Sequence, residues 1–530
     1  MPLTLKGSLV PVASGNSREV FAGRVILDEG GDILAVLRDG EATPAGLDEG
    51  RMVEIENAFI YPGLIDLHSH LGYNALPLWV QPGEPKPFLH HDIWPRRSTY
   101  KPDVSWPAWV LAKAAPEALL VYVQVRALAG GTTTIQGWPS MNRNPANRLV
   151  RTADDQTFPD QNDGKDRVRT STLTLSTSDL EKKAENLEDG LGFIYHCAEG
   201  QLDSLAAREF EDLADTNCLR EKLIAIHCCA VEADAFRRWK ARAELAGDSG
   251  PGSLVWSPFS NLWLYGQTTD IPAARQEGIG VCLGTDWGPS GTKNLLGELK
   301  VAKIVAEDRG WNLDAFDLVE MVTGTPGDAL QRCWGRQVGR LEAGALADVV
   351  VVEKIHQDPF VNLTLATEKN ILLAIVDGQM QYATTRLMRA AGRRDGDAMR
   401  PGGNIHRRVF LIDPADKDEE PENQRPWTWD DVLERLEAAR DDPIAAVDAA
   451  DAPTAAEGRV SSAIGPEGDT LILDLDMPGA PGMAAGPPPP DVRVDIEPFP
   501  SLRHDNPWLD SLEDSGFHGG LLNGLKRFMP

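Results

Sequence analysis

The stretch Tyr61-Pro-Gly-Leu-Ile-Asp-Leu-His-Ser-His70 is the part of this 530-residue sequence from which its fold is inferred. A Pro-Gly turn precedes the apolar run 64–67, which is typical of a buried strand that ends at His68 and His70. Side chains alternate along a strand with a period of two, so both imidazoles can face one side and hold one metal ion. Two histidines with this spacing also occur in polar loops, and residues further along the chain distinguish the two interpretations.

Short apolar runs alternate with helical stretches downstream of this first strand. The next predicted strands are residues 132–136, 149–153, 168–175, 192–197, 223–228, 253–257 and 279–286, and the predicted helices include residues 108–129 and 178–187. Eight strands separated by helical stretches predict an α/β fold of the (β/α)₈ TIM-barrel type.

Polar residues recur at the ends of these predicted strands. His196, His227 and Asp286 are 31 and 59 residues apart, which corresponds to one and two strand-helix units of about 30 residues. They therefore fall at the C-terminal face of the barrel, where active sites assemble. Together with His68 and His70 they provide nitrogen and carboxylate ligands that suit Zn²⁺ or Fe²⁺ and leave one position open for water. A metal ion lowers the pKa of such a water to about 7, so that hydroxide is available at neutral pH.

The regions that flank the barrel are predicted to form a second domain. Residues 1–60 and 335–385 contain short apolar strands, and we expect them to build one small β-sandwich beside the barrel of residues 61–334. Residues 386–530 are acidic and Pro-rich, with one predicted helix at 429–440 and a proline run within 478–490. This composition predicts a partly disordered C-terminal extension.

The composition limits the partners of the chain. A formal net charge of −28 repels phosphate backbones, so we expect no nucleic-acid partner. No apolar run approaches the roughly 18 to 20 residues of a membrane helix, and the first twenty residues do not resemble a signal peptide. Six cysteines without CxxC spacing are typical of reduced structural thiols. These features predict a cytoplasmic protein without a membrane partner, and they leave homo-oligomer formation open.

Several separate motifs within residues 5–385 resemble those of the amidohydrolase superfamily of metal-dependent hydrolases. Four lie at strand ends: Pro62-Gly-Leu-Ile-Asp-Leu-His-Ser-His70, His196-Cys-Ala-Glu199, Ile226-His227 and Gly284-Thr-Asp286. Ser257-Pro-Phe-Ser-Asn261 is similar to the seventh-strand segment of the deaminase and triazine-hydrolase branch, and Gly344-Ala-Leu-Ala-Asp348 resembles the motif that closes the β-sandwich.

The resemblance implies a role for each of the polar residues. The metal ligands would be four residues that hold one divalent ion, Zn²⁺ or alternatively Fe²⁺: His68, His70, His196 and Asp286. Asp286 would also accept a proton from the attacking water, and His227 would orient the hydroxide or polarise the substrate. Glu199 would shuttle a proton to the substrate, although an acidic residue at a helix N-terminus is also favourable for the helix dipole alone.

The end of the fourth predicted strand bears on the number of metal ions. Two-metal members of the superfamily usually place a bridging lysine or glutamate there, whereas this strand ends in Thr172-Leu-Thr-Leu-Ser-Thr-Ser178. Lys182 and Lys183 come later, on the predicted helix. We therefore expect a mononuclear site, as in the deaminase-like branch, rather than the dinuclear site of hydantoinase-like members.

Candidate substrate-binding residues lie in the long loop 71–107 and at the end of the seventh strand: Tyr73, Asn74, Trp94, Arg96 and Asn261. Trp94 could stack on a flat heterocycle, and Arg96 could bind an anionic group. The alternative is an exposed basic turn with aromatic side chains packed beneath it.

The sequence as a whole predicts a metal-dependent hydrolase that acts on carbon-nitrogen bonds other than peptide bonds. Deamination of a small nitrogen heterocycle by a metal-bound hydroxide is the reaction we rank first. The alternatives are a hydantoinase-like hydrolase of cyclic or linear amides and a catalytically inactive barrel scaffold. The retained ligands and Glu199 argue against the scaffold.

Overall fold

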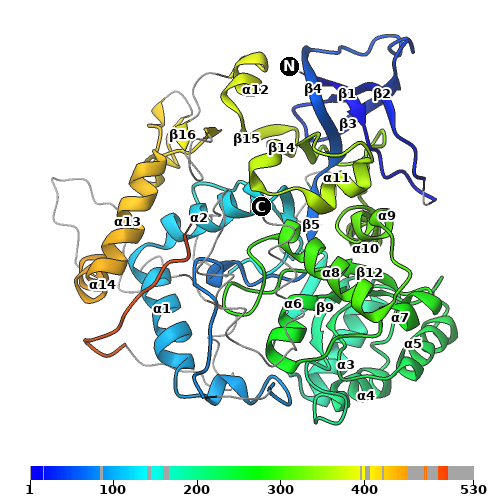
Figure 1. Ribbon diagram of the computed structural model, residues 1–530, viewed down its shortest axis with the longest axis vertical. Helices are drawn as coiled ribbons and strands as arrows, with labels where there is room; N and C mark the ends of the chain where they lie inside the picture. The colour runs from blue at the N-terminus through cyan, green and yellow to red at the C-terminus, as the bar shows by residue number, and fades with distance from the viewer. Residues whose placement is uncertain are drawn as a thin grey trace.

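We describe the structure from a computed structural model, shown in Figure 1. The described residues are 2–15, 17–83, 87–139, 145–154, 156, 158, 166–172, 174–393, 397–399, 406–420, 423–451, 471, 473 and 488–498. The molecule combines helices, a large mixed sheet and a set of parallel strands, which makes it a mixed α/β fold.

The two flanks of the chain meet in one sheet at the top of Figure 1. In the described residues its strand order is β16-β17-β15-β14-β13-β4-β1-β2-β3. The strands are β1 (Leu3–Leu9), β2 (Phe21–Leu27), β3 (Ile33–Arg38), β4 (Arg51–Pro62), β13 (Val349–Glu353), β14 (Ile371–Val376), β15 (Gln379–Ala383), β16 (Asp397–Met399) and β17 (Arg407–Val409).

The sequence predicted a small β-sandwich here, and this remains a prediction. In the structure the strands of both flanks form one continuous hydrogen-bonded sheet. The reason is the long strand β4, which pairs in parallel with β1 on one edge and antiparallel with β13 on the other. Four successive valines, 349–352, make β13 almost completely apolar, as is typical of a strand buried on both faces. Next to it, Asp348 binds Arg151 of the neighbouring domain through two hydrogen bonds of 2.9 and 3.0 Å.

Two parallel sheets carry the eight strands of the barrel-like part of the described chain. Their orders are β5-β6-β7 and β12-β11-β10-β9-β8. The strands are β5 (Leu64–Asp66), β6 (Thr132–Ile135), β7 (Arg151–Thr152), β8 (Val168–Ser171), β9 (Gly192–Cys197), β10 (Leu223–His227), β11 (Ser253–Trp256) and β12 (Gly280–Leu283). A parallel bridge between Ser69 and Asp286 joins the ends of the first and last of these strands. Within the described residues, no ladder joins β7 to β8.

Helices lie between and around these strands (Figure 1). They are α1 (Trp106–Ala114), α2 (Pro116–Ala129), α3 (Thr177–Glu188), α4 (Ala207–Asp215), α5 (Ala233–Leu245), α6 (Pro258–Ser260), α7 (Ile271–Gln276), α8 (Leu295–Arg309), α9 (Ala315–Glu320), α10 (Gly324–Trp334), α11 (Pro359–Leu365), α12 (Thr385–Ala390), α13 (Trp429–Asp441) and α14 (Pro443–Asp451). The prediction of one helix over residues 108–129 is wrong, because Pro116 lacks the N–H that would continue α1 and instead begins α2.

The described part of the C-terminal extension packs against the rest of the molecule. Trp429 of α13 stacks on Tyr122 of α2, with ring centroids 5.9 Å apart. Glu497 accepts a hydrogen bond of 2.7 Å from the Tyr122 hydroxyl at its carbonyl and forms an ion pair with Lys293, in the loop after Asp286. The extension therefore contacts the barrel-like part near the ends of its strands. Most of the predicted disordered proline run, residues 478–487, lies outside the described residues.

Among the described residues, no single helix is long and apolar enough to cross a membrane. One joined pair, Lys101–Ala114 with Pro116–Ala129, meets the length and composition limits together, but it is bent by 112°.

The buried carboxyl group of Glu298, on α8, leads to a prediction about how the stability of the protein depends on pH. Burial raises the pKa of Glu298 on α8 to about 8. Its Oε1 accepts a hydrogen bond of 2.9 Å from the Phe259 N–H, and its Oε2 lies 2.5 Å from the Thr292 hydroxyl. Thr292 has a single hydroxyl hydrogen and also lies 3.1 Å from the Asn294 carbonyl, so a protonated Glu298 can donate to Thr292 while Thr292 donates to Asn294.

We expect Glu298→Gln to remove a pH-dependent loss of stability. Because the pKa in the folded state is raised from an ordinary value of 4.5, the stability that Glu298 contributes is complete below pH 4.5 and is lost as the pH rises towards 8. The slope is at most about 1.4 kcal/mol per pH unit. Unfolding by urea at pH 5 and pH 9 should therefore show that the glutamine variant gains stability relative to the parent at pH 9. An equal difference at both pH values would contradict a raised pKa.

Candidate metal centre and active site

Five polar side chains from four strands meet at the C-terminal ends of the parallel sheets. They are His68 and His70 after β5, His196 in β9, His227 at the end of β10 and Asp286 after β12. The prediction that the first strand extends to the two histidines is corrected, because β5 ends at Asp66. Backbone hydrogen bonds hold this loop to the last strand instead, from Asp286 N to His68 O at 2.9 Å and from His70 N to Asp286 O at 3.3 Å.

The backbone is strained where these side chains leave their strands. Ala198, His227 and Asp286 have φ angles of 52°, 67° and 62°, in the left-handed region that residues other than glycine seldom adopt. Strain of this kind persists where the surrounding structure over-determines the conformation, and it clusters at functional sites. The left-handed turns bring Glu199, His227 and Asp286 towards the same point.

Four of these side chains form a compact set of donor atoms. The Nε2 atom of His196 lies 3.1 Å from that of His68 and 3.2 Å from that of His70. The Oδ1 atom of Asp286 lies 3.2 Å from His68 Nε2 and 3.5 Å from His70 Nε2. Three imidazole nitrogens and one carboxylate oxygen that converge without an intervening side chain suit a divalent cation with nitrogen and oxygen ligands.

The expected protonation states agree with that donor set. Burial and the neighbouring imidazoles hold the pKa of His196 well below 6.5, so its ring is neutral and keeps a lone pair. Burial opposes ionisation of Asp286, but the surrounding histidines, led by His68, lower its pKa below its usual range. Neutral imidazoles and an ionised carboxylate are the forms that bind a metal ion.

Three further residues, to which the sequence analysis assigned no role, orient the candidate ligands. The Ser257 hydroxyl lies 2.6 Å from His68 Nδ1, and Ser260 donates a hydrogen bond of 2.5 Å to Asp286 Oδ2. Asp66 accepts hydrogen bonds from His68 N at 3.2 Å and from the Thr285 hydroxyl at 2.6 Å. Both serines belong to the motif at residues 257–261, but the motif alone did not indicate which ligands they contact.

We expect Ser257→Ala to weaken metal binding about 10- to 100-fold, the usual effect of losing a group that orients a ligating histidine. Competition with a chelator, followed by elemental analysis, measures the change. Ser249→Ala is a matched control, because the Ser249 hydroxyl is exposed and donates a hydrogen bond of 2.7 Å to Glu221, which is not part of the cluster. Unchanged affinity in Ser257→Ala would show that Ser257 does not orient His68.

Glu199 lies beside the candidate ligands, in an enclosed position. Burial raises its pKa to about 7. Its Oε1 atom accepts a hydrogen bond of 2.5 Å from the Tyr265 hydroxyl and lies 3.6 Å from His227 Nε2. Tyr265 in turn accepts a hydrogen bond of 2.9 Å from the indole N–H of Trp94. A carboxyl with such a pKa can both give and take a proton near neutral pH.

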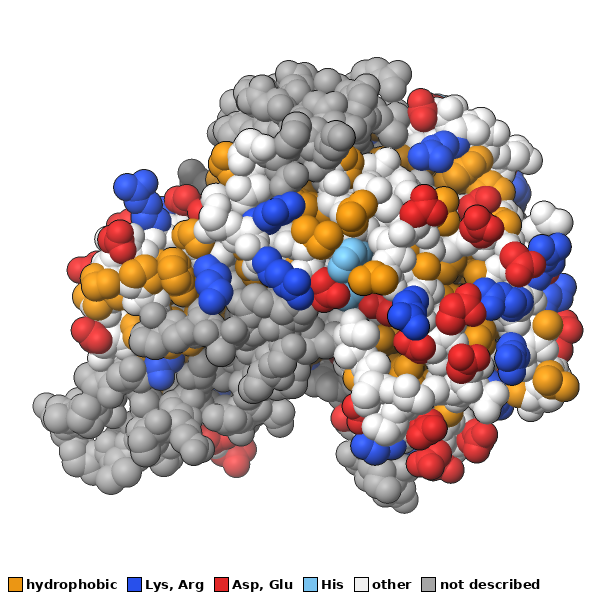
Figure 2. Space-filling model, turned by 90° about the horizontal axis from the view of Figure 1, so that it is seen from below, with side chains coloured by type: hydrophobic (Ala, Val, Ile, Leu, Met, Phe, Trp, Pro, Cys, Tyr) orange, Lys and Arg blue, Asp and Glu red, His pale blue; other side chains and the backbone are white. Residues whose placement is uncertain are grey.

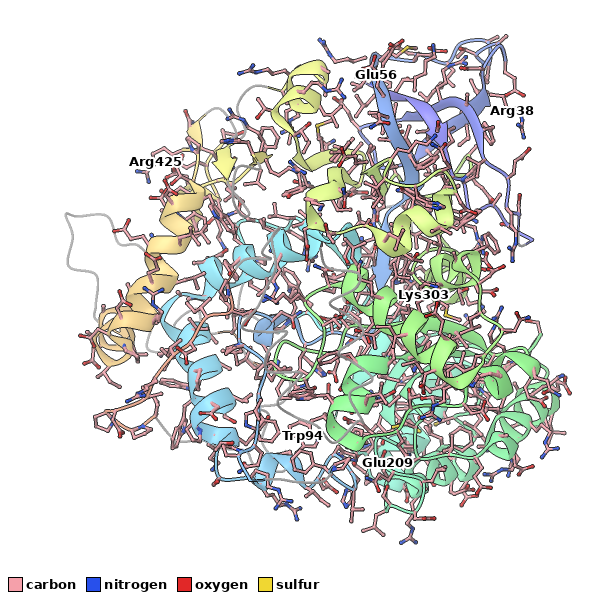
Figure 3. All side chains as sticks on the ribbon, viewed as in Figure 1. Arg38, Glu56, Trp94, Glu209, Lys303 and Arg425 are labelled. Carbon is pink, nitrogen blue, oxygen red and sulfur yellow. The ribbon has the colours of Figure 1, made fainter. Side chains whose placement is uncertain are left out.

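A second acidic residue supports the turn that carries Glu199. Glu209 of α4 accepts a hydrogen bond of 2.7 Å from Ala198 N and lies 2.7 Å from His91 Nε2. Burial opposes a charge on His91, but the hydrogen bond and charge of Glu209 raise its pKa to about 9. Figure 3 shows Trp94 and Glu209 at the lower end of the molecule. Figure 2 views that end face-on and shows a small pale-blue histidine patch among apolar, basic and acidic side chains.

Aromatic residues line one side of the cluster. The Trp287 ring, next to Asp286, has its centroid 6.1 Å from that of His70, 5.4 Å from that of Tyr73 and 5.4 Å from that of Trp94. All three aromatic side chains are buried. The structure thus brings two of the predicted substrate-binding residues, Tyr73 and Trp94, to the metal-ligand cluster.

The other three predicted substrate-binding residues occupy different positions. Asn74 connects two loops, because it donates to Ser69 Oγ at 2.9 Å and accepts from Gly288 N at 3.0 Å. Asn261 contacts His227, with 3.0 Å between its Nδ2 and His227 Nδ1. Arg96 is exposed, and the structure records no contact between it and the cluster in the described residues.

Comparison with known proteins relates this fold and cluster to a family. Residues 171–381 match the amidohydrolase family. A 5-methylthioadenosine/S-adenosylhomocysteine deaminase of Caldicellulosiruptor saccharolyticus is 22% identical over 416 residues, which cover 73% of this chain and 95% of that protein.

Two solved structures are similar in fold. An adenosine deaminase from Xanthomonas campestris with bound zinc has a TM-score of 0.52 and 19% identity, covering 72% of this chain and 92% of its own. A triazine hydrolase from Arthrobacter aurescens has a TM-score of 0.54 and 16% identity, covering 72% of this chain and 94% of its own.

A barrel-like α/β core with imidazole and carboxylate groups at its strand ends is the arrangement of a metal-dependent hydrolase. The chain matches the amidohydrolase family over residues 171–381, and it is similar to deaminases and to a triazine hydrolase over 72–73% of its length. It is an enzyme that hydrolyses carbon-nitrogen bonds other than peptide bonds.

Proposed function

We propose that this enzyme hydrolytically deaminates a small nitrogen heterocycle. The observation that carries the proposal is the position of Glu199, a buried carboxyl with a pKa of about 7 that lies 3.6 Å from His227. Deamination needs a group that delivers a proton to the ring nitrogen or to the leaving ammonia. The names of the relatives, which include deaminases of 5-methylthioadenosine, S-adenosylhomocysteine and adenosine, support the same reaction class.

We assign the following roles to the residues of this chain. His68, His70, His196 and Asp286 would hold one divalent ion, Zn²⁺ or alternatively Fe²⁺. When bound, the ion would act as a Lewis acid and lower the pKa of water, so that hydroxide is available at neutral pH. Asp286 takes up the proton of the attacking water, Glu199 delivers a proton to the substrate, and His227 polarises the carbon that is attacked.

Two observations support a single metal ion. Lys182 on α3 is exposed and pairs with Asp179 at 3.1 Å, and the Nζ of Lys183 lies 5.3 Å from the centroid of the Phe193 ring. Both lysines are therefore engaged away from the histidine cluster.

The aromatic side chains suggest how a planar substrate is held. The Trp287 ring lies at 43° to that of Trp94 and at 80° to that of Tyr73, with ring centroids 5.4 Å apart in both pairs. Such side chains can stack on a flat heterocycle and exclude water from the reacting carbon.

The organisation of the chain is part of the proposal. We propose that residues 61–334 form a closed (β/α)₈ barrel, that residues 1–60 and 335–385 form a small β-sandwich beside it, and that residues 386–530 are an acidic, Pro-rich extension. All six cysteines are free and buried, which supports a reducing compartment such as the cytoplasm.

An ammonia-release screen on the metal-loaded enzyme tests this function. The panel comprises purine nucleosides, free purines, pyrimidines, triazines and pterins, with dihydropyrimidines and hydantoins as amide substrates. Ammonia from at least one heterocycle, with about one Zn or Fe per chain, is the expected result. Ring opening of a cyclic amide without ammonia, or about two ions per chain, would instead favour the hydantoinase-like reaction.

A further inference from the structure

The hydrogen bonds of His227 distinguish two possible roles of its imidazole ring, as a metal ligand or as a hydrogen-bond donor. A neutral histidine with the proton on Nδ1 has a free lone pair on Nε2 and can ligate a metal ion. This use is geometrically open, because ring nitrogens of His68, His196 and His227 lie within 4.8 Å of one another. A histidine with the proton on Nε2 instead donates a hydrogen bond from that atom.

A chain of hydrogen bonds leads to His227 Nδ1 from the neighbouring strand. The Trp256 indole Nε1 lies 2.6 Å from the Thr268 hydroxyl oxygen. Thr268 Oγ1 lies 3.4 Å from Asn261 Oδ1, and Asn261 Nδ2 lies 3.0 Å from His227 Nδ1. Trp256, Asn261 and His227 are all buried.

The indole at the start of the chain fixes the direction of the first bond, and the orientation of the Asn261 amide fixes the direction of the last. An indole N–H can donate but cannot accept, so Thr268 must accept from Trp256. The single hydroxyl hydrogen of Thr268 is then available to Asn261 Oδ1, which turns the NH₂ group of that amide towards His227. An NH₂ group can only donate, so His227 Nδ1 must be the acceptor.

We propose that Trp256, Thr268 and Asn261 act as positioning residues that hold His227 in its Nε2–H tautomer, so that His227 donates a hydrogen bond to the substrate and does not ligate the metal. This inference rests on the proposed function for its consequence in catalysis. Because His227 Nδ1 accepts the hydrogen bond from Asn261, it carries no hydrogen, so the hydrogen of the ring is on Nε2. That hydrogen then points from Nε2 to the side of Glu199, 3.6 Å away.

Thr268 is the best position for a test, because in the described residues its hydroxyl bonds with Trp256 and Asn261 and makes no recorded hydrogen bond with His227 itself. Thr268→Val keeps the shape of the side chain and removes both hydrogen bonds, which leaves the Asn261 amide free to turn. Thr268→Ser keeps the hydroxyl and serves as the matched variant that should restore the chain. The ring nitrogens of ¹⁵N-histidine-labelled, zinc-loaded enzyme report the tautomer by NMR, with His227 assigned from the signal that His227→Gln lacks.

In the parent enzyme and in Thr268→Ser we expect the Nε2–H tautomer. In Thr268→Val we expect a mixture of tautomers and a kcat about 10- to 100-fold lower, with KM and zinc content little changed. An Nδ1–H tautomer in the zinc-loaded parent, or a tautomer and kcat that Thr268→Val leaves unaltered, would overturn the proposal. Loss of zinc from His227→Gln would also overturn it, since His227 would then be a ligand.

A second variant covers the case in which Thr268→Val fails to fold. Trp256→Phe keeps an aromatic ring and removes the indole N–H that begins the chain, so it should shift the tautomer in the same way. The tautomer and the zinc content are measured without substrate. A failure of the proposed deamination therefore appears in the ammonia-release screen alone, whereas a failure of this inference appears in the NMR spectrum.

Discussion

Asp286→Asn should reduce kcat/KM by at least about 10⁴-fold while the protein remains folded. The substitution replaces an ionised carboxylate by a neutral amide of almost the same shape. Asp286 Oδ1 lies 3.2 and 3.5 Å from the Nε2 atoms of His68 and His70, so the amide removes the only negative charge in this donor set of the described residues. It also removes the base that we propose takes up the proton of the attacking water.

Steady-state ammonia release, elemental analysis and thermal unfolding should be measured together for this variant. Asp270→Asn is the matched control, because Asp270 is an exposed N-cap of α7 and asparagine caps a helix equally well. The control should have parental activity and metal content. If Asp286→Asn kept more than about a tenth of the parental activity, the assignment of Asp286 as ligand and base would be wrong.

Glu199→Gln should lower kcat by about 10²- to 10⁴-fold, the usual contribution of a positioned acid-base group. Glutamine keeps the shape of the side chain and can still accept the hydrogen bond from the Tyr265 hydroxyl. It cannot give up or take up a proton at neutral pH. We therefore expect metal content and unfolding temperature to stay at the parental values, which separates this variant from those of the ligands.

Glu232→Gln provides the control for Glu199→Gln. Glu232 is exposed at the N-cap of α5 and its side chain makes no capping hydrogen bond, so activity should not change. A Glu199→Gln enzyme that turns over at the parental rate would show that Glu199 does not transfer a proton to the substrate. A variant that loses its metal would assign Glu199 to the ligand set.

The superfamily and the type of chemistry could be predicted from the sequence because they depend on local patterns. A short apolar run ending in His68-Ser-His70 and the spacing of His196, His227 and Asp286 follow from strand periodicity and from the length of a strand-helix unit. Parallel strands deliver the residues at their C-terminal ends to one face. The structure accordingly brings these five side chains together.

The break between α1 and α2 could be predicted only in part from the sequence. Pro116 was visible in the sequence, and its missing N–H is a local property, but the apolar pattern on both sides of it favoured one long helix. The single sheet that joins both ends of the chain could not be predicted from local patterns. It depends on β4 pairing with β13, about 290 residues later, and no local pattern specifies such a partner.

The contacts that orient the site were decided only by the tertiary structure. Tyr265 reaches Glu199, and Ser257 reaches His68, across strands that are far apart in the chain. Asn261, predicted to bind substrate, contacts His227 instead of lying free. These distances depend on left-handed backbone turns such as that at His227, which the surrounding packing imposes against the intrinsic preference of the residue. By itself, the sequence determined which side chains could carry the chemistry, because residue type and strand period are local; the fold decided which of them touch, because contact depends on the packing of distant segments.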